Sequence, residues 1–130
     1  MKTLSIQSNR ITKIESLSEL INLEELYLSH NGLQKIEGLE ANVNLTTLDV
    51  GGNRIEVIEG VDHLASLNEF WANDNQIASI VSLDAQLGPS KCPELNTIYL
   101  EGNPAQRAEG SSYRTKVMLA LPQISQIDAT

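Results

Sequence analysis

Hydrophobic and polar positions follow one another along this chain in a unit of 22 residues. An asparagine closes each unit, at Asn9, Asn31, Asn53 and Asn75, and successive positions differ by the same step (31 − 9, 53 − 31 and 75 − 53 each give 22). Counted from each asparagine, the same columns hold leucine, isoleucine or another apolar residue. For the second asparagine these columns are Leu23, Leu26, Leu28, Leu33, Ile36 and Leu39. A fixed period of this length indicates stacked structural repeats, because so short a unit cannot bury its apolar side without neighbours.

Each unit predicts one short strand and one turn. Alternating segments recur at 26–28, 48–50, 70–72 and 98–100, and they predict parallel strands with every second side chain turned inward. The asparagine amide can satisfy backbone groups where the chain leaves the strand. The Ile-x-x-Ile-x-x-Leu spacing predicts 3₁₀ or irregular helical turns on the opposite side. The predicted fold class is therefore α/β, a leucine-rich-repeat solenoid with a short parallel concave sheet, 3₁₀ or helical convex turns and a helical C-terminal cap.

The domain boundaries follow from where the period holds. Residues 1–103 contain about five 22-residue units, of which the first is incomplete. The step from Asn75 to Asn103 is 28 residues (103 − 75), and the surplus lies in 84–93, where Gly and Pro predict a tolerated surface insertion in a longer convex connection. Residues 104–130 predict the cap, with a helix that starts at Ser111 or Ser112, runs through Ala120 and ends before Pro122.

The N-terminal end is predicted to lack such a cap. Met1 already occupies the first apolar column of a unit, which predicts an exposed strand edge and exposed apolar side chains. We therefore expect either that the chain is a fragment of a longer repeat protein or that this end self-associates.

The amino-acid composition indicates which class of partner and which cellular compartment to expect. The net charge of −8 disfavours direct nucleic-acid binding and favours a partner that carries Lys and Arg. A single cysteine and the absence of an apolar leader at the start indicate a reducing compartment, which predicts the nucleus and cytoplasm. The longest apolar run, residues 117–121, is too short for a membrane helix.

Enzymatic chemistry finds no support in the sequence. No metalloprotease, nucleophile-elbow, phosphate-loop or Cys-x-x-Cys motif is present, and His30 and His63 fall in different columns of the repeat. We predict a non-enzymatic chain with no catalytic residues, no cofactor and no metal. Cys92, between Lys91 and Pro93, is a candidate reactive thiol without a nearby base in sequence.

Aromatic and acidic residues share the predicted concave side. The only tryptophan and two of the three tyrosines stand in one outward column of a chain with 4% aromatic residues. Exposed rings flanked by carboxylates are typical of protein-binding hot spots, because the ring supplies buried area and the acids pair with basic groups. The predicted partner-binding residues, with Trp71 the foremost, are Asp49, Glu69, Trp71, Tyr99, Tyr27, Glu101 and Glu25.

More specific stretches carry a family resemblance over the whole chain, at 8–15, 25–32, 69–75, 116–122 and 126–130. These segments resemble the C-terminal repeats and cap of the leucine-rich-repeat regulatory subunit of type 1 serine/threonine protein phosphatase. The resemblance implies that the concave face docks the phosphatase catalytic subunit and modulates its activity, assembly or localisation. It also implies that Asp49, Glu69, Trp71 and Tyr99 correspond to contact positions of that family. The alternatives are a scaffold for ribonucleoprotein (spliceosomal) assembly and a cytoskeletal adaptor, because similar repeats occur in both.

Overall fold

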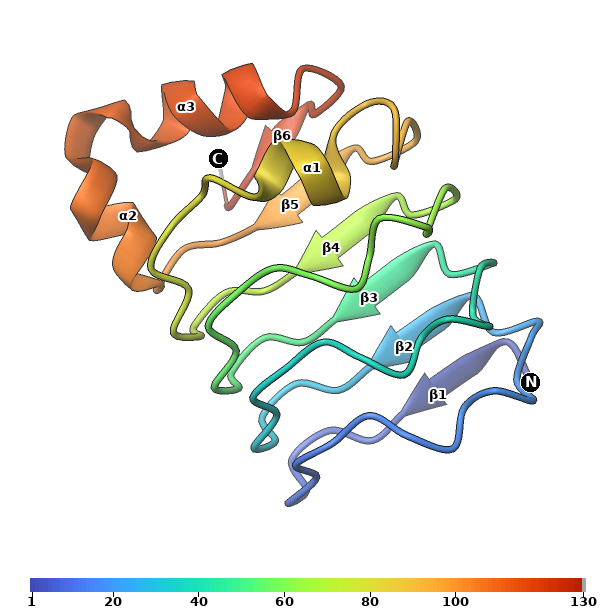
Figure 1. Cartoon of the computed structure of the whole chain (residues 1–130). Coiled ribbons are helices and arrows are strands. Elements are labelled where there is room, and N and C mark those ends of the chain that lie inside the picture. Colours follow the sequence, from blue (N-terminus) through green and yellow to red (C-terminus); the bar gives the residue numbers. More distant parts are fainter. Residues whose placement is uncertain (130) are drawn as a thin grey trace.

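Short parallel strands stack in chain order to form one sheet in the computed structural model, which describes residues 1–129 (Figure 1). The strands are β1 (Thr3–Ser5), β2 (Glu25–Tyr27), β3 (Thr47–Asp49), β4 (Glu69–Trp71), β5 (Thr97–Tyr99) and β6 (Gln126–Ile127). Each strand pairs in parallel with the strand that follows it in the sequence. Paired residues are one repeat unit apart, so that Leu26 stands opposite Leu48 and Leu48 opposite Phe70. The 22-residue step in the sequence therefore becomes one strand spacing in the sheet.

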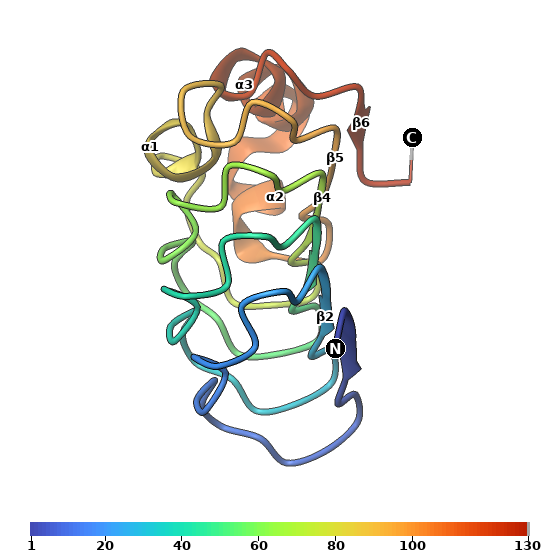
Figure 2. The same cartoon turned by 90° about the vertical axis from the view of Figure 1, so that its right-hand side faces the viewer.

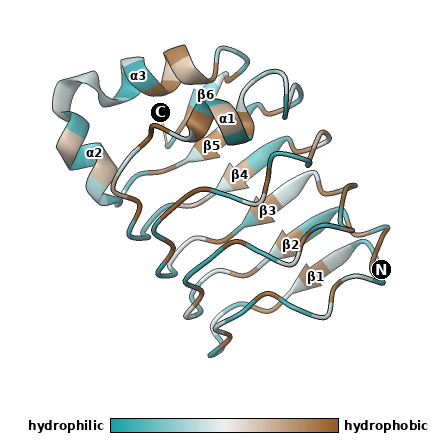
Figure 3. Ribbon diagram, viewed as in Figure 1, coloured by the Kyte–Doolittle hydropathy of each residue, from teal (hydrophilic) through white to brown (hydrophobic). Residues whose placement is uncertain are grey.

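The inward columns form a single continuous core. Every apolar column predicted for the unit that contains Asn31 is buried, and the central residue of β4, Phe70, is the largest fully buried side chain. We call each folded repeat unit a rung. The hydropathy colouring in Figure 3 shows apolar segments recurring at the same place in successive rungs. Burial of this kind stabilises neighbouring rungs together, because each rung covers the apolar side of the next.

The asparagine column forms a hydrogen-bonded ladder at the carboxyl ends of the strands. The Asn53 amide nitrogen donates to the carbonyls of Leu28, Val50 and Gly51 at 3.1, 2.8 and 3.1 Å. Its oxygen accepts two backbone N–H groups of the preceding rung at 3.2 and 3.0 Å. The predicted structural role of these asparagines is confirmed, because each buried amide bonds backbone groups of its own turn and of the preceding rung.

The 84–93 segment is mostly exposed, as expected for a surface insertion, but its Leu87 and Cys92 side chains also fill space in the core. Helix α1 (Leu83–Leu87) begins at its edge, and Leu83, Leu87 and Cys92 are fully buried. The side chain of Gln86 accepts the backbone N–H of Val61 at 3.2 Å. The convex segments of the first three rungs are turns and bends without a regular helix. They contain isolated 3₁₀-type hydrogen bonds, such as that from the Leu20 N–H to the Leu17 carbonyl at 3.0 Å, which agrees with the predicted irregular helical turns.

The C-terminal segment closes the stack with helices α2 (Pro104–Glu109) and α3 (Tyr113–Ala120), the 3₁₀ turn η1 (Gly110–Ser112) and strand β6. Helix α3 lies within the predicted helix, but Ser112 makes no side-chain cap hydrogen bond. One carboxylate joins the cap to the last full rung: Asp128 accepts the N–H groups of Leu100 and Glu101 at 2.7 and 3.0 Å and the Tyr113 hydroxyl at 2.9 Å. Along residues 1–129, no helix combines the length and the apolar character that spanning a membrane requires.

Strand β1 forms the other edge of the sheet. Thr3 and Ser5 are exposed, and Leu4 and Ile6 are half-buried. A hollow of about 210 Å³ lies beside this strand, lined mainly by apolar side chains that include Ile6. The expectation of exposed apolar groups at this edge therefore agrees with the structure, and self-association through it stays a prediction.

Candidate protein-docking face

The side chains of β1 to β6 that point away from the core form a surface that we call the outer face. It corresponds to the predicted concave side, and Figure 2 shows the strands along one side of the stack with the convex turns along the other. Strand register places Tyr27 beside Asp49, Asp49 beside Trp71, and Trp71 beside Tyr99. The outer face therefore carries one continuous row across four strands.

The two aromatic residues at the end of this row pack against each other. The Trp71 and Tyr99 ring centroids are 5.3 Å apart at an interplanar angle of 65°, an edge-to-face arrangement. The indole N–H of Trp71 donates to a carboxylate oxygen of Glu69 at 3.3 Å. Both rings are half-buried, so that they present surface to solvent from a fixed orientation. An aromatic pair held in this way loses little conformational freedom when a partner covers it.

Carboxylates surround the other aromatic residue of the row. Partial desolvation and then the negative charges of Glu25, Glu69 and Asp49, in that order, raise the pKa of the Tyr27 phenol. The Glu25 carboxylate also accepts the Thr3 hydroxyl at 2.9 Å. Acids from three strands therefore act on one phenol, and this negative charge suits a basic partner.

Asp49 is more enclosed than strand alternation predicts. The residue is only 5% exposed, and one oxygen of its carboxylate accepts the Gly51 N–H at 3.0 Å. Burial raises the pKa of Asp49, and this effect is opposed by the Gly51 N–H, the nearby His30 and a hydrogen bond from Ser29. Asp49 thus supports the turn after β3 as well as supplying charge, and direct contact with a partner stays a prediction.

The carboxyl-terminal end of the outer face contains a residue that sequence reasoning missed. Strand β6 places Gln126 opposite Thr97, and the Gln126 amide nitrogen donates to the Tyr99 hydroxyl at 3.1 Å. Glu101 is exposed just beyond β5, and its backbone N–H is held by Asp128. The apolar spacing of Leu121, Ile124 and Ile127 was the available signal for a further rung.

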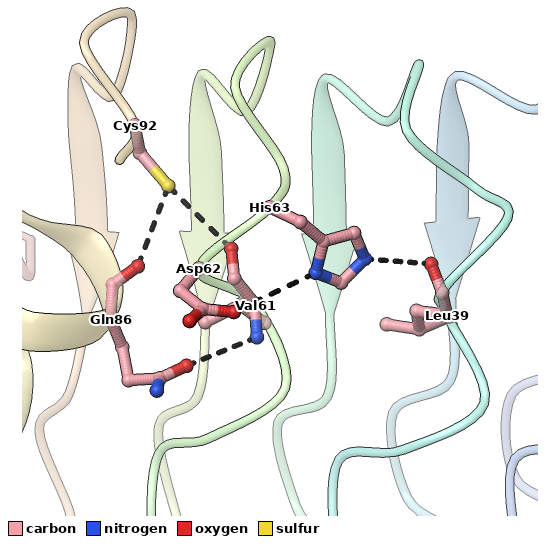
Figure 4. Close-up of polar contacts among 6 residues, drawn as sticks. All are labelled: Leu39, Val61, Asp62, His63, Gln86 and Cys92. Carbon is pink, nitrogen blue, oxygen red and sulfur yellow. Dashed lines mark hydrogen bonds and ion pairs between the residues drawn. The ribbon is translucent and has the colours of Figure 1, made fainter. Parts of the chain in front are cut away.

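The side chains of His63 and Cys92 lie outside the outer face and contact different backbone carbonyls. Figure 4 shows that His63 approaches the Leu39 carbonyl, at 2.9 Å from Nε2, and Asp62, at 3.8 Å from Nδ1. The Cys92 thiol points to the carbonyls of Val61 and Gln86, each 3.8 Å away. Within the part of the chain that the structure describes, no group of three or more His, Cys, Asp or Glu side chains is placed to hold a metal ion.

Burial disfavours the thiolate form of Cys92, which argues against the candidate reactive role suggested by its position. Desolvation, with a smaller contribution from Asp62, raises the pKa of its thiol from 9.0 to about 11. Because only the thiolate attacks, we expect an aromatic disulfide reagent at pH 8 to modify the folded chain at least about 100-fold more slowly than the urea-unfolded chain. The folded-state rate should still be rising with pH at pH 10. Equal rates for folded and unfolded chain would contradict this assignment.

Comparisons with known proteins agree with the architecture. A family model described as "Leucine Rich repeats (2 copies)" matches residues 1–41, and one described as "Leucine Rich repeat" matches residues 41–57. A chain in the crystal structure of the SNF/U2A′ complex of Drosophila melanogaster superposes with a TM-score of 0.83 at 27% identity, covering 98% of this chain and 72% of that one. The chain is a leucine-rich-repeat solenoid. An internalin of Listeria monocytogenes, with a TM-score of 0.78 at 22% identity over 100% of this chain and 35% of its own, supports the fold alone.

Curated relatives of this solenoid are named as phosphatase regulators. Protein phosphatase 1 regulatory subunit SDS22 of Schizosaccharomyces pombe is 46% identical over 60 residues, which are 46% of this chain and 18% of that protein. Protein phosphatase 1 regulatory subunit 7 of Homo sapiens is 61% identical over 36 residues, which are 28% of this chain and 9% of that protein. The matches therefore span less than a fifth of these relatives. The prediction of a non-enzymatic chain agrees with them, because they are named as regulatory subunits.

Proposed function

We propose that the outer face docks the catalytic subunit of type 1 serine/threonine protein phosphatase and that the chain regulates its activity, assembly or localisation without a reaction of its own. The observation that carries this proposal is the fixed Trp71–Tyr99 pair with Glu69 hydrogen-bonded to the indole. A half-buried, ordered aromatic pair beside a carboxylate is suited to anchor a protein surface. The names of the curated relatives supply the identity of the partner.

The negative charge of the chain indicates that the partner surface is basic. The chain has a net charge of −8, and three acids of the outer face, Glu25, Glu69 and Asp49, lie close enough to Tyr27 to raise its pKa. A complementary surface carries Lys or Arg, which can pair with the acids and pack against the rings. The acids then steer encounter, and the aromatic pair contributes most of the affinity.

Direct binding to the purified catalytic subunit at two salt concentrations tests the proposal. We expect binding by calorimetry at 50 mM salt and an affinity roughly three- to tenfold lower at 300 mM, because screening shortens the range of the attraction. Glu69→Gln should reduce both the affinity and its dependence on salt. The matched control is Glu56→Gln, since Glu56 is exposed on the turn side of the third unit, away from the strands. Absence of binding at 50 mM salt would refute the proposed partner.

A scaffold role in ribonucleoprotein assembly is the second candidate. The likeness to a chain of the SNF/U2A′ complex, at a TM-score of 0.83 over 98% of this chain, favours an assembly role on the same fold. The acidic outer face favours a protein contact over a nucleic-acid contact in such an assembly. The same experiment separates the two candidates, because only the regulatory role requires direct binding to the phosphatase. Both roles suit the nucleus and cytoplasm, where we propose that the protein acts.

A further inference from the structure

The C-terminal cap contributes a side chain to the outer face. Strand β6 pairs with β5 so that Ile127 continues the core column of Ile98 and Gln126 lies opposite Thr97. The Gln126 amide nitrogen donates to the Tyr99 hydroxyl at 3.1 Å and to the backbone carbonyl of Asp128 at 3.0 Å. The second contact fixes the amide relative to its own strand, so that the first contact fixes the phenol.

Polar and ring contacts connect this amide to Trp71 and Glu69 of the outer face. The Tyr99 ring meets Trp71 edge to face at 5.3 Å between centroids, and the indole N–H donates to Glu69 at 3.3 Å. Gln126, Tyr99, Trp71 and Glu69 therefore form a connected series across β6, β5 and β4. A half-buried phenol without a hydrogen bond at its hydroxyl can rotate, and the edge-to-face contact depends on ring orientation.

The cap strand is itself well anchored. The Asp128 carboxylate accepts two N–H groups from the end of β5 and the hydroxyl of Tyr113, which is buried at the start of α3. Two backbone N–H groups of the cap, those of Ser125 and Gln126, also donate to the Asn96 carbonyl at 2.9 and 3.1 Å. Gln126 thus acts on Tyr99 from a strand held at several points.

We infer that Gln126 is a positioning residue of the outer face. It holds the Tyr99 phenol in the orientation that fixes the Trp71 ring for contact with a partner. This inference rests on the proposed docking function for its effect on affinity. It also makes the cap part of the binding surface rather than a lid over the last rung. Pre-orientation of this kind raises affinity by reducing the ordering that binding requires.

The test is a double-mutant cycle of Gln126→Ala and Tyr99→Phe, read out in two ways. The first readout is the near-ultraviolet circular dichroism of the free chain, in which Trp71 is the only tryptophan. The second is affinity for the purified phosphatase catalytic subunit. We expect Gln126→Ala to weaken the indole signal and to lower affinity about two- to tenfold, the range of one net hydrogen bond. In the Tyr99→Phe background, which lacks the hydroxyl, Gln126→Ala should have no further effect on either readout.

Controls separate this role from general stability and from the partner's identity. Gln34→Ala removes an exposed glutamine away from the outer face and should change neither readout. An equal effect of Gln126→Ala with and without the Tyr99 hydroxyl would overturn the inference, as would an unchanged indole signal in the single variant. If the wild-type chain fails to bind the phosphatase, the proposed function is wrong, and the dichroism cycle alone decides whether Gln126 positions Tyr99.

Discussion

Replacing Asn53 with alanine should lower the free energy of unfolding by about 4 kcal/mol, a loss in the range expected when a buried hydrogen-bond network is broken. The two N–H groups of the Asn53 side chain share three carbonyl acceptors, and its oxygen accepts two backbone N–H groups of the preceding rung. Alanine leaves all five backbone groups without that partner in a site that is 7% exposed. Chemical denaturation in urea, followed by far-ultraviolet circular dichroism, measures the change.

Asn9 is the matched control, because it occupies the same column of the repeat. Its side chain is exposed, and its nitrogen donates one hydrogen bond, to the Gln7 carbonyl at 2.9 Å. We expect Asn9→Ala to cost less than about 1 kcal/mol, the net value of one exposed hydrogen bond. Similar losses for both variants would show that the column contributes through local turn propensity and not through the buried ladder.

The repeat core could be predicted from the sequence because each rung has the same pattern of inward apolar residues. The columns of Leu26, Leu48 and Phe70 are inward in the structure as the 22-residue period predicts, since one register error would expose every apolar residue of a rung. Regular spacing identifies the strand, its inward side and its neighbour at the same time. The parallel sheet of a leucine-rich-repeat solenoid follows from that regularity.

The parts that break the period were predicted poorly. Strand β6 has two residues and follows a helix, so that its pairing with β5 depends on Asp128 and Ile127 and not on a repeated motif. The 84–93 segment contains Gly and Pro, which indicate a loop, yet its own Leu87 and Cys92 side chains fill core space. Single-sequence patterns do not report contacts that are made once between segments far apart in the chain.

The sequence predicted which residues of the candidate site face outward, but not how their side chains contact one another. Strand alternation places Tyr27, Trp71 and Tyr99 on the outer face, and the register brings them into one row. Alternation does not show that the Gly51 N–H and Ser29 enclose the Asp49 carboxylate. These details depend on rotamers and on neighbouring rungs, which the pattern of a single rung leaves open.

Trp71→Ala should weaken binding to the phosphatase catalytic subunit by about 2 kcal/mol or more, which is roughly 30-fold in dissociation constant. The indole is half-buried on the outer face, where it contacts the Tyr99 ring and donates a hydrogen bond to Glu69. Its removal takes away the largest ring of the face and leaves the Tyr99 edge without its partner. Isothermal calorimetry is the suitable measurement, because the variant lacks tryptophan fluorescence.

Trp71→Phe separates ring area from the indole hydrogen bond. Phenylalanine keeps an aromatic surface next to Tyr99 but cannot donate to Glu69, so that its affinity should fall between those of the wild type and Trp71→Ala. Because Trp71 lies outside the buried core, both variants should retain the far-ultraviolet spectrum and most of the stability of the wild type. An affinity of Trp71→Ala within twofold of the wild type would remove the outer face as the docking surface, and it would leave the solenoid itself unchanged, since the columns that build the rungs do not include this residue.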